Sequence, residues 1–163
     1  MRRQNVNKFN LKEKITNLIQ NSNSLKINEL QKLSNQIKEL FNKTQFDTDI
    51  ISTIEKEYKR IGASRVAVRS SATSEDSMEA SFAGQQNTYL NIIGINSLIE
   101  SIKACWASVF EARAIFYRNS QNIAHFDSGM SVVIQQMVQP DVSGVMFTLE
   151  PTTLDPDKIV IEA

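Results

Sequence analysis

The sequence contains few of the residues from which the common metal and nucleotide motifs are built. Its 163 residues include one cysteine, Cys105, and one histidine, His125. An internal disulfide is therefore impossible, and zinc sites built from Cys and His are excluded. The five glycines stand at positions 62, 84, 94, 129 and 144. They are too scattered for a Walker A loop or a dinucleotide-binding fingerprint.

Long apolar runs are also absent. No stretch approaches the roughly 20 apolar residues that span a bilayer, so we expect no membrane association. The basic start, Met1-Arg2-Arg3, is not followed by the apolar run of a signal peptide. With a single cysteine, a reducing cytoplasm is the expected compartment.

Neither sign of charge is in excess, because 18 Lys and Arg balance 18 Asp and Glu. Residues 1–60 nevertheless hold 12 basic and 7 acidic side chains. This excess could indicate a nucleic-acid-binding arm. Its lysines alternate with glutamates, as on solvated helix faces, and no aromatic-basic cluster accompanies them. We therefore expect no nucleic-acid partner.

Three amphipathic helices are predicted in residues 1–62. Asn10 and Glu13 can form a capping box at the start of the first helix, and Gly62 ends the third. The apolar residues recur at intervals of three and four: Leu11, Ile15, Leu18 and Ile19, then Leu30, Leu33, Ile37, Leu40 and Phe41, then Ile50, Ile51, Ile54 and Tyr58. These faces indicate core, so residues 1–62 are expected to be a helical segment without chemistry.

Beyond residue 62 the pattern changes to that of strands. Strands are predicted at 65–69, 88–92, 131–138, 143–148 and 158–161. One long helix is predicted over 97–118, with Trp106 and Phe116 on its apolar side. Residues 139–142, which include Pro140, are expected to form a tight hairpin connection. The order of elements indicates an α+β fold with a largely antiparallel sheet in residues 63–163.

The strand that ends at Arg69 leads into the segment most suited to binding phosphate. A guanidinium offers a planar fork of donors, and the two serines that follow add hydroxyls. Gly84 would let the backbone approach a phosphate that a Cβ would block. Alternatively, Arg69 pairs with Glu75 or Asp76 in a surface loop. The residues alone leave both interpretations open.

Three carboxylates between these positions, Glu75, Asp76 and Glu79, allow two interpretations. Hard cations such as Mg²⁺ take oxygen ligands, so the cluster could bind a metal. Clustered negative charge repels a polyphosphate, however, and we interpret the segment as a solvated acidic lid. His125 has no carboxylate or nucleophile at a motif spacing, so an exposed or locally bonded histidine is expected.

Residues 135–138 form a second candidate site. The sequence Gln135, Gln136, Met137 and Val138 precedes a proline. A strand ending in this way can present backbone N–H and C=O groups to an adenine edge, while Met and Val pack on the ring. The same pattern equally fits an edge strand that enters a hairpin.

Taken together, these segments resemble a known family. The resemblance rests on Val66–Asp76 and Ala80–Asn91, and continues through Ala104–Ser108, Arg113–Arg118, Gln136–Val138 and Ser143–Thr148. They are similar to the N-terminal domain of the pyruvate phosphate dikinase and phosphoenolpyruvate synthase family. The resemblance implies an ATP-grasp fold, in which two α+β subdomains hold ATP between them.

The resemblance also implies roles for individual residues. Arg69 would contact the ATP phosphates, with Gly84 and Thr88 lining the phosphate side. Gln135, Gln136, Met137 and Val138 would form the adenine hinge. In the family, ATP phosphorylates a histidine on a separate domain, and the phosphoryl group then passes to pyruvate in the synthases or to the antibiotic in rifampin phosphotransferases.

Some parts of the family pattern are not found in these 163 residues. They are a glycine-rich segment with a phosphate-binding lysine, the Mg²⁺ carboxylates and the phosphohistidine domain. Mg²⁺ is thus an expected cofactor whose ligands lie outside this chain, and the chain alone is expected to be inactive. The resemblance thus implies the ATP-binding part of a phosphoenolpyruvate synthase-like phosphotransferase. The alternatives are a fragment of a rifampin phosphotransferase-like enzyme or of a pyruvate phosphate dikinase, or a degenerate, non-catalytic ATP-grasp module.

Overall fold

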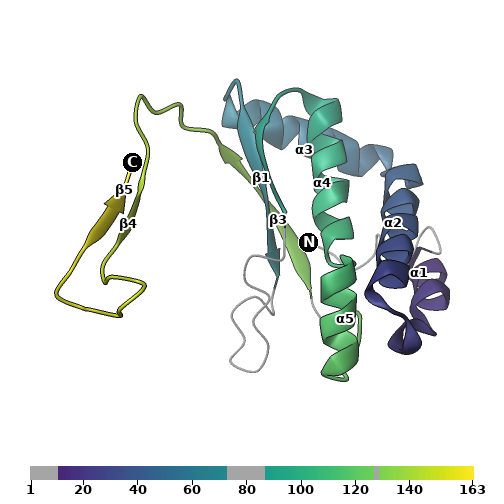
Figure 1. The fold of residues 1–163 in the computed structure, drawn as a ribbon. Coiled ribbons are helices and arrows are strands. Elements are labelled where there is room, and N and C mark those ends of the chain that lie inside the picture. Colours follow the sequence, from purple (N-terminus) through teal and green to yellow (C-terminus); the bar gives the residue numbers. More distant parts are fainter. Residues whose placement is uncertain (1–10, 73–86, 127–128) are drawn as a thin grey trace.

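The computed structural model of the chain describes residues 11–72, 87–126 and 129–163. Its elements are, in order, α1 (Leu11–Ile19), η1 (Ser22–Ser24), α2 (Ile27–Lys43), α3 (Thr48–Ile61), β1 (Val66–Ala72), β2 (Thr88–Ile92), α4 (Ile95–Ser108), α5 (Ala112–Ser120), β3 (Met130–Gln136), β4 (Val145–Phe147) and β5 (Val160–Glu162). Figure 1 shows the helices on one side of a sheet and the β4–β5 pair on the other. The predicted α+β fold is confirmed. Among the described residues, no helix has both the length and the apolar character needed to span a membrane.

Three antiparallel strands form the main sheet, in the order β2-β1-β3. β1 pairs with β3 along its whole length, from Val66 opposite Gln136 to Ala72 opposite Met130. This pairing carries β1 three residues beyond the predicted end at Arg69. β3 is consequently an edge strand, as one interpretation of residues 135–138 expected, but it does not enter the hairpin of that interpretation.

A β-bulge sets which side chains of β2 face the helices. The register shifts between Val66, opposite Ile92, and Val68, opposite Tyr89. Asn91 has a positive φ of 58° at this point. Because of the extra residue, Tyr89 and Ile92 both pack against the same core despite being three positions apart.

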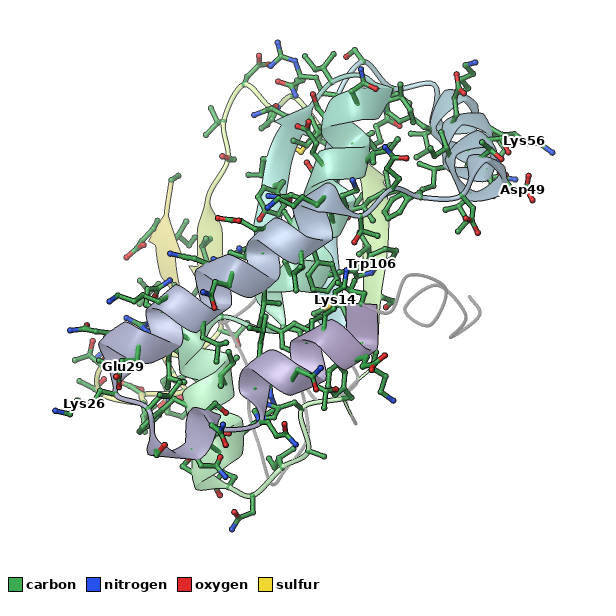
Figure 2. The ribbon with its side chains drawn as sticks, turned by 90° about the vertical axis from the view of Figure 1, so that its right-hand side faces the viewer. Lys14, Lys26, Glu29, Asp49, Lys56 and Trp106 are labelled. Carbon is green, nitrogen blue, oxygen red and sulfur yellow. The ribbon has the colours of Figure 1, made fainter. Side chains whose placement is uncertain are left out.

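Two large hydrophobic clusters of described residues join the helices to one another and to the main sheet. One joins α1 and α2 to the end of α4 and to α5; the other joins the sheet to α3 and α4. Trp106 of α4 packs against both clusters, and its ring lies 5.4 Å from that of Phe46. In Figure 2 it lies centrally among the helices, whereas charged residues such as Lys26 and Asp49 lie at the periphery.

The predicted helical segment forms helices close to the expected bounds. Leu11, Ile15 and Ile19 are buried in α1, and α3 ends at Gly62, whose φ of 67° is left-handed. In α3, Ile54 is the buried residue, with 8% exposure. Asn10, the predicted cap, lies outside the described residues.

The single helix predicted over 97–118 is wrong, because the chain breaks between α4 and α5. Phe110 turns into the first cluster with only 5% exposure, and Glu111 is extended, with ψ 146°. Lys38 of α2 forms an ion pair with Glu111 at 2.7 Å. The break resets the helical phase, so Phe116 lies on the outer face, 55% exposed, instead of in the core.

The predicted hairpin through residues 139–142 is also wrong. β1 occupies one edge of β3, and the chain from residue 137 onward leads away from the sheet (Figure 1). β4 pairs with β5 instead. A Cβ added at Gly144 would lie 2.4 Å from the carbonyl oxygen of Glu162, so the close approach of the two strands requires glycine there.

Candidate functional site

The face of the main sheet that points away from the helices, called the open face below, carries Arg69. Along β1, Val66 and Val68 are fully buried against α4. Side chains alternate along a strand, so Arg69 lies on the opposite face, and it is exposed. Figure 1 shows the labelled helices on the other side of β1.

Two other predicted site residues share this face with Arg69. Thr88 of β2 stands directly opposite it, and both side chains are exposed. On the β3 side of β1, Arg69 pairs with Val133, and Gln135 lies two residues further along β3. Directly paired side chains in an antiparallel sheet are about 5 Å apart at Cβ. The sheet thus brings a cation, a hydroxyl and an amide onto one surface.

The outer edge of β3 offers unpaired backbone groups. Met137 donates its N–H to the carbonyl of Arg65 at 3.0 Å, so the groups of Met137 point toward β1. In an antiparallel ladder these directions alternate, and the N–H and C=O of Gln136 therefore point outward. Val138 follows with 76% of its surface exposed. This edge can present one donor and one acceptor to the rim of a planar base.

Gly84 lies outside the described residues, as do Glu75, Asp76 and Glu79. Among the described residues, no group of three or more His, Cys, Asp or Glu side chains could hold a metal ion. The structure thus brings together Arg69, Thr88 and residues 135–138 on the open face and at the β3 edge.

Cys105 of α4 contacts the main sheet from the helix side, a role that the sequence did not reveal. Its Sγ lies 4.0 Å from the carbonyl oxygen of Val68 and 3.7 Å from that of Asn87. Ser70 also donates its hydroxyl to the Asn87 carbonyl, at 3.1 Å. Burial raises the pKa of the thiol to about 11, so it stays protonated and can donate. These contacts hold Asn87, the residue before Thr88, next to β1.

Arg118 and His125 form a second cluster, away from the sheet. Arg118 is only 2% exposed; it donates from Nε to His125 Nδ1 at 3.1 Å and from Nη2 to the Val109 carbonyl at 2.5 Å. Its guanidinium lies 5.8 Å from the centre of the Phe110 ring. The expected local bonding of His125 is confirmed. Burial, then the Arg118 charge, lowers the pKa of His125 to about 4, so the imidazole is neutral and can accept.

Sequence reasoning missed the structural role of Arg118, although a signal was present. Arg118 follows Ala114 and Ile115 at the spacing of one helix face, and both are buried. A charged residue at a core position needs several partners. The cluster ties the α4–α5 break to the segment that leads into β3, and we assign it no part in chemistry.

A family profile described as "Pyruvate phosphate dikinase, AMP/ATP-binding domain" matches residues 2–163. The chain belongs to this family. The resemblance seen in the sequence is thereby confirmed, and the family is one of AMP/ATP-binding domains.

Curated relatives from archaea and bacteria agree with this assignment. A probable phosphoenolpyruvate synthase of Staphylothermus marinus is 45% identical over 97% of this chain. Phosphoenolpyruvate synthases of Aeropyrum pernix and Aquifex aeolicus are 48% and 41% identical over 83% and 94% of it. The aligned part is 20%, 17% and 19% of the three relatives, so the chain spans about a fifth of their length. It corresponds to the ATP-binding part of a phosphoenolpyruvate synthase-like enzyme.

Proposed function

We propose that the open face and the β3 edge bind ATP, with Arg69 and Thr88 at the phosphates and Gln135, Gln136, Met137 and Val138 at the adenine. The observation that carries the proposal is the cross-strand pairing of Arg69 with Thr88, one strand away from Gln135. Three residues from distant parts of the sequence meet on one exposed surface.

The chemistry of these residues fits a nucleotide triphosphate. The guanidinium of Arg69 supplies a fixed positive charge and several N–H donors, and the Thr88 hydroxyl adds a further donor beside it. The outward N–H and C=O of Gln136 match the alternating donor and acceptor on the rim of adenine. Gly84 is assigned to the phosphate side on the family resemblance alone.

The position of the β4–β5 pair is consistent with a nucleotide held between two layers. The pair lies on the side of the sheet opposite the helices (Figure 1). Met146 and Ile161 are paired on one of its faces, with 61% and 68% exposure, while Val145 and Phe147 on the other face are 55% and 40% exposed. A strand pair that is apolar on both faces is typical of a sheet covered on both sides. We propose that it forms a second layer within the nucleotide-binding subdomain.

We further propose that the enzyme to which this chain corresponds is a phosphotransferase of the pyruvate, water dikinase type. The relatives carry the name phosphoenolpyruvate synthase. In such an enzyme Arg69 would offset the charge on the ATP phosphates while a P–O bond of ATP breaks and the phosphoryl group passes to a histidine of another domain. The phosphohistidine would then give up the group to pyruvate. The chain alone would bind nucleotide without catalysing its turnover. The expected location of the enzyme is the cytoplasm.

Magnesium belongs to this proposal only as the usual companion of ATP. The described residues do not include a set of ligands that would hold it, so none of the steps above is assigned to the ion. Its ligands are expected outside this chain, as is the phosphohistidine domain. The division into a helical segment, 1–62, and a nucleotide-binding subdomain, 63–163, likewise stays a prediction.

A titration of the ¹⁵N-labelled chain with ATP and Mg²⁺ tests the site. We expect the largest amide shift changes at Arg69, Thr88 and Gln135–Val138, with those of α1 and α2 unchanged. Absence of any change at these amides would favour the alternative, a degenerate module without nucleotide binding. Uniform small changes over the whole surface would also contradict the proposed site.

A further inference from the structure

Val133 is an exposed apolar side chain at the centre of the candidate site. It pairs directly with Arg69 across the β1–β3 ladder and is 46% exposed. Its neighbours in β3, Val132 and Ile134, pack into the core on the helix side. Alternation along the strand therefore places Val133 on the open face.

The position of Val133 along the strand is specific. Gln135 lies two residues further on, about 6.6 Å away at the usual rise of roughly 3.3 Å per residue. Arg69 lies directly opposite Val133, in the neighbouring strand β1. A nucleotide with its phosphates at Arg69 and its base edge at Gln136 can lay its sugar and the adjoining purine face across Val133. The purine face is the least polar surface of the ligand.

We propose that Val133 packs against the sugar and purine face of the bound nucleotide and so helps to determine affinity for the nucleoside part. The inference rests on the proposed function and goes beyond it, because Val133 is outside the segments assigned to the phosphates or the hinge. An apolar contact at this point buries part of a valine and part of the purine, which stabilises the complex without a hydrogen bond.

The three ligands adenosine, AMP and ATP separate this contact from the phosphate contacts. Val133→Thr keeps the β-branched shape and strand propensity but replaces a methyl by a hydroxyl. Val133→Ala removes the contact. We expect Val133→Ala to weaken binding about fivefold, and Val133→Thr to weaken it about threefold, from the lost apolar burial. The factor should be the same for all three ligands.

Two variants serve as controls in the same amide titration. Val142→Thr makes the same chemical change at another exposed valine, 77% exposed in the connection after β3, and should leave all three affinities unchanged. Arg69→Ala should weaken ATP binding and leave adenosine binding unchanged. Together they distinguish a nucleoside contact from a general loss of affinity.

The outcomes separate the two proposals. If Val133→Thr and Val133→Ala bind all three ligands like the wild type while Arg69→Ala loses ATP, the inference about Val133 is wrong and the site stands. A loss confined to ATP would also overturn it. If the wild-type chain binds none of the ligands, the proposed function fails, and the role of Val133 fails with it. Should Val133→Ala not fold, the threonine variant decides.

Discussion

At the scale of single residues, the structure shows how two of the rarest side chains in the chain are held. Cys105 is buried and His125 is half-buried, and both use their hydrogen-bonding capacity on near neighbours. Their pKa values move away from neutrality in opposite directions, to about 11 and about 4, because burial opposes charge on each. Neither is poised to exchange a proton at pH 7.

Cys105 should resist alkylation in the folded chain. The thiolate is the reactive form, and burial both hides the sulfur and raises its pKa. With iodoacetamide at pH 8, mass spectrometry should find little labelling of the native chain and complete labelling in denaturant. Rapid labelling of the folded chain would show that the thiol does not lie beneath the sheet.

His125 should make the chain less stable as the pH is lowered through the range from about 6.5 to about 4. Its pKa is about 4 in the folded chain and 6.5 in its ordinary state, so the unfolded chain takes up the proton first. The contribution of the neutral imidazole to the free energy of unfolding is therefore complete above pH 6.5 and is lost as the pH falls toward 4. Charged groups near the imidazole include Arg118, which donates a hydrogen bond to it, and Lys12, which lies over the neighbouring Phe126 ring.

Urea denaturation at several pH values measures this effect. His125→Gln removes the titrating group, so its stability should change less between pH 7 and pH 4.5 than that of the wild type. Equal pH dependence in the two proteins would contradict the assigned imidazole environment.

At the scale of elements, most boundaries follow from hydrophobic spacing, whereas strand partners do not. The helix that buries Leu30 and Ile37 and the strand at 88–92 were predictable because local patterns specify them. The α4–α5 break was not, because it depends on the ion pair of Lys38, in α2, with Glu111 and on the hydrogen bond from Arg118, in α5, to the Val109 carbonyl. The sequence likewise could not show that β4 pairs with the distant β5 rather than with β3.

Gly144→Ala should disrupt the β4–β5 pair. The added Cβ would lie 2.4 Å from a backbone oxygen of Glu162, which cannot move without displacing β5. Amide hydrogen exchange should quicken at residues 145–147 and 160–162 and stay unchanged in the main sheet. Ser143→Ala, one residue away, is the matched control. Unaltered protection in Gly144→Ala would refute the close approach.

Trp106 and Phe116 provide a direct comparison of two aromatic residues that the sequence placed on the same helix face. Trp106→Ala should destabilise the chain by about 3 kcal/mol, because the ring packs against both clusters. Phe116→Ala should change stability by about 0.5 kcal/mol or less, because the side chain is 55% exposed. Thermal or urea unfolding measures both values. Similar losses of stability in the two variants would instead support one continuous helix over residues 97–118.

At the scale of the whole molecule, the candidate site arises from topology. Arg69, Thr88 and Gln135 were each proposed as site residues from the sequence, on local chemistry and family resemblance. Their convergence depends on the central position of β1 between β2 and β3, which no local pattern specifies. Val133 was missed for the same reason: in the sequence it is one valine in an apolar strand, and only the register places it beside Arg69.

The central claim is that Arg69 binds the phosphates of ATP from the open face, and calorimetric titration of Arg69→Ala with ATP and with adenosine tests it most directly. A charge-assisted hydrogen bond contributes about 1.5–3 kcal/mol, so ATP affinity should fall roughly ten- to a hundredfold while adenosine affinity and the melting temperature stay unchanged. In the intact enzyme the same variant should lose phosphoryl transfer. Wild-type affinity for ATP in Arg69→Ala would contradict the account.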